Sequence, residues 1–593
     1  MRNKDVVRNV TQLIGTLRRK NPFFFWSTII VYALIGGVST YVNVYLLMKV
    51  LLTIERKEAF SSLVYLIILV VFVEISLKLI ESYYLNRMHP VQSLKLKQTI
   101  NNEIIEKAST IDYKCYDDSK FYDDIMLSLE KSDESLTNSL DIIGVYAKGI
   151  VGIVAVIPLF DEISPFLLLF VLLSVVTGII VQKKLNKCYY ERYLSMVPYI
   201  KRNSYIMTRF AFWEYSEELR INNFPSVLIK HFKNTYQNMN KVIKQHGRKI
   251  ILYSICKGLV SYIVIELIVV GYLSYNLFVT KTLSAAVFMV ALAAVLNVKD
   301  YLNNMAENYE KLMENSLYVS KIQSFMNYEN TVVGGDIHPQ EGVYDIEFKH
   351  VYFKYPFSEN YVLKDFSLHI RKGEKAAIVG LNGAGKTTIV NLLLRLYDIQ
   401  EGVIEVNGVD IKQYDLDEYR RSFGVVFQDF NLYSVSLEEN IELGQSEDTQ
   451  TIENALKKLE FDLEKIGLDS EISSEFDDDG IKLSGGESQK IAIARALVND
   501  RGTNILDEPS SSLDPFMESK MNSILCKEME GKTIVFISHR LTTTTLADRI
   551  FYIENGSVIE SGSHKELMNK HGMYEKMYNI QASKYIKKEC CQE

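Results

Sequence analysis

The 593-residue sequence predicts a multidomain protein: an all-α domain of six membrane spans, followed by an α/β domain of the P-loop class with an α-helical subdomain. Three observations predict this order. Long apolar runs are confined to the first half of the chain. A strand pattern, a glycine-rich loop and a helical pattern follow one another at 374–397. A second buried-strand pattern ends in an acidic pair at 507–508.

The first half is predicted to cross a membrane six times. About 20 mostly apolar residues in a helix span the hydrocarbon core, where every backbone amide needs a partner within its own segment. Runs such as VYLIILVVFV at 64–73 meet this requirement. The predicted spans are 23–51, 60–82, 141–160, 164–182, 252–279 and 283–298.

Composition predicts the domain boundaries and which regions of the chain lie on the cytoplasmic side of the membrane. A polar, glycine-containing stretch without helical periodicity predicts a linker at 327–343. The membrane domain is then 1–326, the α/β domain 344–583 and a C-terminal tail 584–593. Lysine and arginine crowd the N-terminus and the long loops at roughly 80–140 and 183–250, which predicts that these regions and the α/β domain are cytoplasmic.

Charge and cysteine usage exclude some classes of partner. A formal net charge of -7 gives no broad attraction to phosphate backbones, so nucleic acid is not expected as a partner. The six cysteines form no metal-binding pattern, and neither zinc nor disulfide bonds are expected. We assign no role to the pair Cys590 and Cys591, since a solvated chain end explains it better than lipidation or redox chemistry.

Two carboxylates interrupt the apolar spans. A charge in hydrocarbon is costly unless it faces a cavity or a partner. Glu74 lies one helical turn before Lys78, so an ion pair explains it at least as well as a role in the membrane pathway. Glu266 has no such neighbour in 261–270 and is the candidate for lining a substrate pathway.

The glycine-rich loop has the chemistry of a phosphate site. Its sequence at 380–387, GLNGAGKT, lets backbone N–H groups close around phosphate oxygens at the start of a helix. Lys386 is expected to neutralise the β and γ phosphates, and the Thr387 hydroxyl to bind Mg²⁺. The predicted nucleotide-binding residues of this loop are Gly380, Asn382, Gly383, Ala384, Gly385, Lys386, Thr387 and Thr388.

The acidic pair indicates hydrolysis of the nucleotide. Asp507 is placed to hold Mg²⁺, and Glu508 to polarise a water molecule that attacks the γ-phosphate. A surface acidic pair at a strand end is the alternative. Thr503 and Asn504 precede the pair where a buried strand prefers apolar residues, so we expect this strand to be less well covered than usual.

The sequence LSGGE at 483–487, followed by SQKIAIARAL, resembles the ABC transporter family, in the exporter branch where six spans precede one nucleotide-binding domain. The resemblance implies an adenine-stacking role for Tyr355, a Mg²⁺-sensing and catalytic role for Gln428, and a γ-phosphate contact for His539. It assigns Asp514 to the loop after the acidic pair and Glu475 to contacts with the membrane domain. Glu487 departs from the family pattern, which usually has Gln at this position.

The resemblance also implies that Ser484, Gly485 and Gly486 act on ATP held by another subunit. One chain is then insufficient, and either a homodimer or a pair with a second half-transporter is expected in the cell membrane. ATP and Mg²⁺ are the implied cofactors.

The cargo is less closely defined by the resemblance. Segments 116–122 and 507–515 resemble bacterial lantibiotic and peptide exporters, so a peptide is the expected cargo. A multidrug or lipid exporter is the next interpretation. An ATP-regulated channel or sensor is the alternative of another class, and import on the same scaffold stays open.

Overall fold

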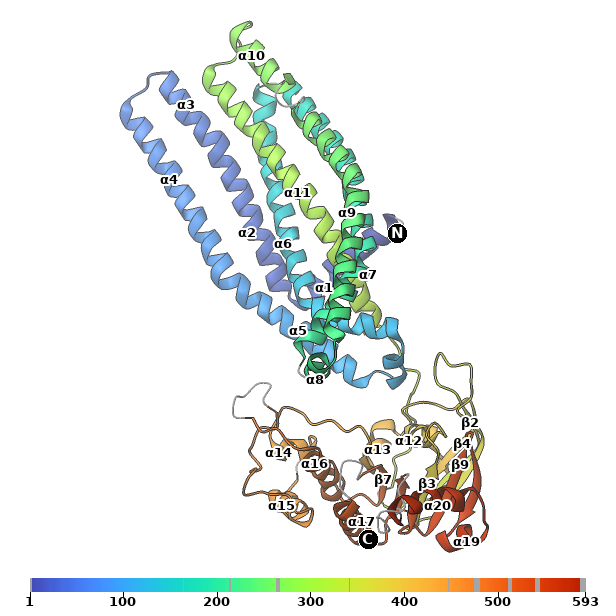
Figure 1. Cartoon of the computed structure of the whole chain (residues 1–593). Helices are drawn as coiled ribbons and strands as arrows, with labels where there is room; N and C mark the ends of the chain where they lie inside the picture. Colours follow the sequence, from blue (N-terminus) through green and yellow to red (C-terminus); the bar gives the residue numbers. More distant parts are fainter. Residues whose placement is uncertain are drawn as a thin grey trace. The chain divides into compact units, whose positions relative to one another are not determined.

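The computed structural model describes residues 3–586, apart from 164, 213–214, 263–266, 341, 446, 474–479, 510–514 and 539–543. The chain forms two compact units (Figure 1). The first comprises Met1–Thr110 and Lys120–Tyr328, and the second comprises Ile111–Ser119 and Glu329–Glu593. A short segment of the first long loop therefore packs with the second unit. The sequence did not predict this grouping.

The first unit contains only helices and turns among its described residues (Figure 1). Two of its long helical stretches are each continued through a π-helical turn, and two others contain an internal proline, Pro158 and Pro198. The helices are α1 (Asn3–Lys20), α2 (Pro22–Thr40) with η1 (Tyr41–Leu46) and α3 (Leu47–Glu55), α4 (Phe60–Tyr83) with η2 (Tyr84–Met88) and α5 (His89–Thr110), α6 (Ser119–Ile163), α7 (Pro165–Ala211), α8 (Ser216–Ile221), α9 (Phe224–Tyr262), α10 (Val270–Phe278) and α11 (Ala285–Met326).

Several of these helices have the length and composition of membrane spans. Within the described residues there are four such stretches, Pro22–Glu55, Phe60–Thr110, Glu134–Pro158 and Ala285–Met326. The predicted spans 164–182 and 252–279 each include residues outside the described part. Helix α4 is the clearest case, because it is apolar almost throughout and none of its residues is buried. A helix that is apolar on all faces and exposed in water would be unstable, so the composition of α4 suits a lipid environment.

The predicted pair between Glu74 and Lys78 is wrong. Lys78 Nζ lies 2.6 Å from Glu81 Oε2, one turn in the other direction along α4. Spacings of three and four residues both bring side chains together on a helix, so the sequence alone could not choose between the two partners. Glu74 is exposed on the same helix, and the pathway candidate Glu266 lies outside the described residues.

The second unit combines two sheets. The four-stranded sheet is antiparallel, in the order β2-β1-β4-β5, and the six-stranded sheet has the order β10-β9-β3-β8-β7-β6, with its last five strands parallel. The strands are β1 (Ile346–Phe353), β2 (Leu363–Ile370), β3 (Lys375–Gly380), β4 (Glu401–Val406), β5 (Val409–Asp410), β6 (Phe423–Val426), β7 (Thr503–Asp507), β8 (Thr533–Ile537), β9 (Arg549–Glu554) and β10 (Ser557–Gly562).

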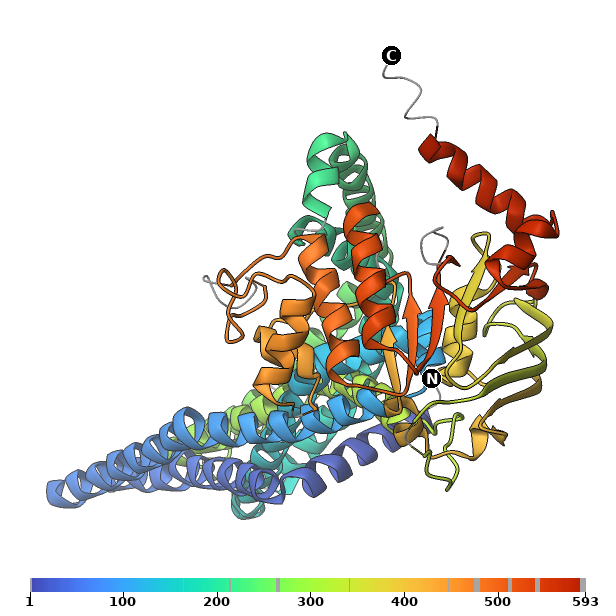
Figure 2. The same ribbon diagram turned by 90° about the horizontal axis from the view of Figure 1, so that it is seen from below.

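Helices surround this sheet pair, and in Figure 2 the orange helices of the helical subdomain lie beside the strands. Short helical turns join some of the strands, and two helices end the described chain. The helical elements are α12 (Lys386–Leu393), η6 (Ile411–Gln413), α13 (Leu416–Arg421), α14 (Leu437–Glu442), α15 (Thr449–Lys458), α16 (Gly485–Val498), α17 (Pro515–Glu528), α19 (His564–Asn569) and α20 (Met573–Ile586).

Strand β3 divides the core of this unit in two. Successive side chains of a strand point to opposite faces. Accordingly, Ile378 packs with α12 and the antiparallel sheet, whereas Ala377 and Val379 pack with the apolar faces of α14, α15 and α16. This alternation buries β3 between two cores. The loop that follows β3 lies at the carboxyl edge of the sheet, where ligands bind in open α/β folds.

The expectation that strand β7 is poorly covered is wrong, since all five of its residues are buried. Thr503 Oγ1 accepts a hydrogen bond from Tyr344 N at 2.9 Å, and Asn504 Nδ2 donates to Arg501 O at 2.9 Å. A Cβ atom at Gly424 on the neighbouring strand would lie 2.1 Å from Asn504 Oδ1. Gly424, which has no side chain, therefore leaves room for the Asn504 side chain, whose Oδ1 has no hydrogen-bond partner among the described residues.

Candidate nucleotide-binding and hydrolysis site

A cavity of about 970 Å³ lies at the carboxyl end of β3. Its lining comes from the loop after β3, the start of α12, and the ends of β6, β7 and β8. Ala384 does not line the cavity and is buried in the core below the loop. The predicted site residues that the structure brings together here are Tyr355, Gly380, Asn382, Gly383, Gly385, Lys386, Thr387, Thr388, Gln428, Asp507 and Glu508.

Two glycines give the loop a shape that other residues would strain. Gly383 has a φ of 81° and Gly385 a φ of 103°, both in the left-handed region that side chains disfavour. A Cβ atom at Gly385 would also lie 2.9 Å from Leu363 Cδ2. Gly385 is the N-cap of α12, so the loop delivers its backbone N–H groups and the positive end of the helix dipole to the cavity.

Lys386 is held in the loop by backbone carbonyl groups. Its Nζ donates to Gly380 O at 2.9 Å and to Leu381 O at 3.2 Å. Burial lowers the pKa of Lys386, and the carboxylates of Glu508 and Asp507 partly oppose this. The cavity thus contains a buried ammonium group whose charge an anionic phosphate would stabilise.

Asp507 and Thr387 suit a hard divalent cation. Burial and the nearby Glu508 raise the pKa of Asp507 to about 6, although Lys386 and a hydrogen bond with Thr387 lower it. Asp507 Oδ1 is buried and has no hydrogen-bond partner among the described residues. Carboxylate and hydroxyl oxygens are the ligands that Mg²⁺ prefers. Together with Gln428, which lines the same cavity, these residues would hold Mg²⁺, whose charge would neutralise the phosphates.

Glu508 adopts a strained backbone conformation at the end of β7. Its φ is 48°, in the left-handed region, and its N–H donates to Ile537 O at 2.9 Å. Such strain persists only where surrounding structure enforces it, and it is concentrated at functional sites. The side chain lines the cavity, where a carboxylate can accept a proton from an attacking water molecule.

Tyr355 connects the cavity to the loop segment that packs with this unit. Its Oη lies 2.9 Å from Thr388 Oγ1, and its ring is perpendicular to the Tyr397 ring with a centroid separation of 5.2 Å. Tyr397 Oη in turn donates to Asp117 Oδ2 at 2.6 Å. Asp117 ends η3 (Tyr113–Asp117), and the Tyr113 ring also packs on Tyr397. Tyr397 therefore contacts both Tyr355, which lines the cavity, and η3.

Replacing Tyr397 with Phe is expected to loosen η3 while the aromatic packing on Tyr355 is retained. The variant loses only the hydrogen bond to Asp117, and a hydrogen bond to a charged group contributes about 1.5–3 kcal/mol. Amide hydrogen exchange in 113–117 should become several-fold faster, with ATP affinity unchanged. Tyr113→Phe is the matched control, because its hydroxyl makes no hydrogen bond among the described residues. Equal exchange in both variants would contradict the role of the Tyr397 hydroxyl.

The residues at 484–486 form the start of α16 and do not line the cavity of their own chain. Ser484 is the N-cap, and Glu487 completes a capping box by accepting hydrogen bonds from Ser484 N at 2.8 Å and Ser484 Oγ at 2.7 Å. These bonds lower the pKa of Glu487. A capping box accepts either Glu or Gln at this position, which accounts physically for the departure at Glu487.

Some predicted residues lie outside the described part of the chain, namely His539, Asp514 and Glu475. Conversely, five residues of the cavity wall were not predicted from the sequence. Two of them come from the C-terminal helix α20, and no local motif marks them. The missed residues are Val362, Leu381, Ile537, Met577 and Gln581.

Comparison with known proteins shows which family and which relatives the chain resembles. Residues 363–511 match the family described as ABC transporter. The chain is 27% identical over 589 residues to the subtilin transport ATP-binding protein SpaT of Bacillus subtilis, covering 95% of this chain and 92% of that protein. It is 42% identical over 243 residues to an ATP-dependent lipid A-core flippase of Alkalilimnicola ehrlichii, covering 40% of each chain. A putative multidrug export protein of Staphylococcus aureus is 39% identical over 255 residues, 43% of this chain and 44% of that protein.

The fold has a solved counterpart. A bacterial Atm1-family ABC exporter with ATP bound superimposes with a TM-score of 0.79, covering 95% of this chain and 98% of that chain at 20% identity. At this identity the likeness shows a helical membrane domain followed by an α/β nucleotide-binding domain. With the family match and the relative that aligns along nearly the whole chain, these findings support an exporter-type ABC half-transporter, in which ATP hydrolysis is coupled to transport across a membrane.

Proposed function

We propose that this transporter exports a peptide of the lantibiotic type across the cytoplasmic membrane. The alignment with the subtilin transport protein supports this proposal, because it covers 95% of the chain and so includes the helical domain that meets the cargo. The lipid and multidrug relatives align over only 40% and 43% of the chain. A match of that extent cannot include all of both units, so it says less about cargo.

We further propose that the working unit is a dimer with two shared ATP sites. The Ser484 turn does not line the cavity that contains Lys386 in its own chain, so a second subunit has to bring such a turn to that cavity. In this arrangement Gln428, His539 and Glu508 act on the γ-phosphate with Mg²⁺ bound at Asp507 and Thr387, and Tyr355 stacks on adenine. Two identical chains suffice, and a second half-transporter is the alternative partner.

ATP binding drives the transport cycle in this proposal. The ammonium of Lys386 and the N-terminus of α12 bind the phosphates of one subunit's ATP, and Ser484, Gly485 and Gly486 of the partner close on the same γ-phosphate. Closure is transmitted through loop segments such as η3 and opens the membrane cavity outward. Hydrolysis at Glu508 removes the γ-phosphate and resets the dimer, because ATP binds the closed state more tightly than the open one.

Accumulation of subtilin in inside-out vesicles tests the cargo. We expect vesicles containing the transporter to accumulate subtilin when ATP and Mg²⁺ are present, and Glu508→Gln vesicles to accumulate none. The comparison arms use a hydrophobic dye and a fluorescent lipid, the cargo classes of the other relatives. Accumulation of dye or lipid without subtilin would refute peptide export in favour of a multidrug or lipid exporter. ATP hydrolysis with no accumulation of any of the three would favour a channel or sensor.

A further inference from the structure

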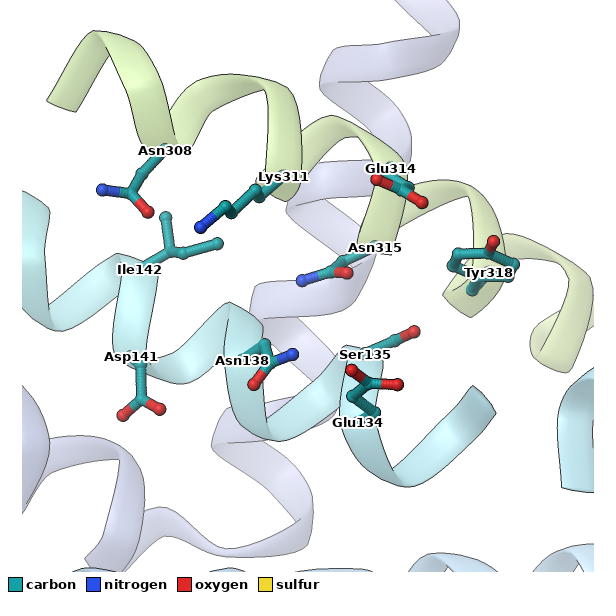
Figure 3. A pocket seen from close by; sticks show the side chains of 10 residues that line it. All are labelled: Glu134, Ser135, Asn138, Asp141, Ile142, Asn308, Lys311, Glu314, Asn315 and Tyr318. Carbon is teal, nitrogen blue, oxygen red and sulfur yellow. The ribbon is translucent and has the colours of Figure 1, made fainter. Parts of the chain in front are cut away.

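The first unit contains a second cavity, of about 510 Å³, between α6 and α11 (Figure 3). It lies at the start of the apolar stretch Glu134–Pro158 of α6, and its α11 residues lie beyond that helix's predicted span. A cavity of this size accommodates a ligand the size of a short peptide segment. Nine of its ten lining residues are polar or charged: Glu134, Ser135, Asn138, Asp141, Asn308, Lys311, Glu314, Asn315 and Tyr318, with Ile142 the tenth.

The charged groups of this cavity differ in whether they have a partner within the protein. Asp141 lies 2.7 Å from His89 Nε2, and in Figure 3 its carboxylate points away from α11. Glu314 interacts with the hydroxyl group of Tyr193, which also hydrogen-bonds to the hydroxyl group of Tyr318. Lys311, in contrast, is exposed and forms no ion pair or hydrogen bond with any described residue, so its ammonium group is available to a ligand. Figure 3 shows its ammonium group directed from α11 toward α6.

Amide side chains make up much of the remaining wall. Asn308 and Asn315 come from α11, and Asn138 comes from α6 (Figure 3). The Asn315 Nδ2 group is buried and has no hydrogen-bond partner within the described chain. A buried N–H without a partner is costly, so such a group in a cavity wall points to a ligand that would complete it. An asparagine side chain offers both donors and acceptors, which match the two polar groups of a peptide bond.

We propose that this cavity binds the polar end of a peptide cargo, with Lys311 pairing with a terminal carboxylate. Asn315 and Asn138 hydrogen-bond to the adjoining peptide bonds. This assignment rests on the proposed peptide export and adds the site at which the transporter recognises its cargo. It also predicts that recognition depends on the charge at the end of the peptide.

The test compares peptide forms and transporter variants in the same reconstituted system. The full-length transporter is placed in phosphatidylcholine liposomes, and the subtilin concentration that gives half-maximal stimulation of ATPase activity is measured for the native peptide and for a C-terminally amidated form. An ion pair at an exposed lysine contributes up to about 1 kcal/mol, so amidation is expected to raise that concentration by up to about fivefold. In Lys311→Gln both forms should act at the same, higher concentration.

Matched variants separate recognition from stability. Lys321→Gln is on the same helix but outside the cavity lining, and it should keep the full discrimination between the two peptide forms. Lys321→Gln should also keep the basal ATPase activity that is measured without peptide, and thermal unfolding of Lys311→Gln shows whether that variant is folded.

The experiment distinguishes failure of the cavity assignment from failure of the proposed peptide export. If native subtilin stimulates and Lys311→Gln still discriminates between the two forms, the cavity assignment is wrong while peptide export stands. If no form of subtilin stimulates ATPase activity, both the cavity assignment and the proposed peptide export are wrong. If the Lys311 change alters only the response to added anionic phosphatidylglycerol, the cavity binds lipid headgroups and the assignment to cargo is overturned.

Discussion

Glu508→Gln is expected to lower the rate of ATP hydrolysis by about a hundredfold or more, while ATP still binds. The loss of a positioned general base costs about 10²–10⁴-fold in rate. Glu508 has a strained φ of 48° and lines the nucleotide cavity, so the backbone places this carboxylate where the γ-phosphate would lie. Glutamine keeps the size and hydrogen-bonding shape of the side chain but cannot accept the proton from water.

Trapped nucleotide is the second readout of this variant. After incubation with labelled ATP and Mg²⁺, Glu508→Gln should retain ATP through gel filtration, whereas the unmodified transporter should release ADP. Glu530→Gln is the matched control, because Glu530 is exposed in the turn before β8 and far in sequence from the acidic pair. Hydrolysis by Glu508→Gln at the rate of this control would remove Glu508 from the catalytic step.

The part of the site that could be predicted is the part whose geometry is local. The loop at 380–387 follows a buried strand and opens a helix, so the order of residues alone places its glycines and Lys386 together. Asp507 and Glu508 could be added because a second buried strand of the same parallel sheet ends at its carboxyl edge. No such rule places Met577 and Gln581, which reach the cavity from a helix almost 200 residues further along the chain.

The two wrong predictions, on the cover of β7 and on the partner of Lys78, likewise concern contacts that the sequence pattern does not determine. Thr503 and Asn504 suggested a poorly covered strand, yet the strand is fully buried, with Thr503 Oγ1 hydrogen-bonded to Tyr344 N and Asn504 Nδ2 to Arg501 O, while Asn504 Oδ1 has no hydrogen-bond partner among the described residues. Lys78 has carboxylates on both sides at helical spacing, and the structure selects Glu81. In both cases the deciding contact depends on side-chain placement that periodicity does not encode. The packing of Ile111–Ser119 with the second unit is likewise a tertiary property.

Lys386→Ala is expected to weaken ATP binding by more than about a hundredfold, since breaking a buried charge pair costs about 3–5 kcal/mol and each 1.4 kcal/mol is tenfold in affinity. Two carbonyl oxygens, Gly380 O and Leu381 O, hold the ammonium group within the loop before any nucleotide binds. The ligand therefore does not have to order a flexible side chain. Arginine at this position keeps the charge, but its planar group cannot replace a compact ammonium between these carbonyls, so Lys386→Arg should also bind weakly.

Equilibrium binding of a fluorescent ATP analogue measures this effect, and thermal unfolding without nucleotide measures stability separately. We expect a large loss of affinity with a small change in unfolding temperature. Without nucleotide, the Lys386 ammonium group contributes two hydrogen bonds to backbone carbonyl groups, of about 1 kcal/mol each. Lys372→Ala, in the exposed turn before β3, should change neither quantity. If Lys386→Ala bound the analogue within threefold of the unmodified protein, the cavity at the carboxyl end of β3 would not be the phosphate site, and the shared-site dimer built on it would fail as well.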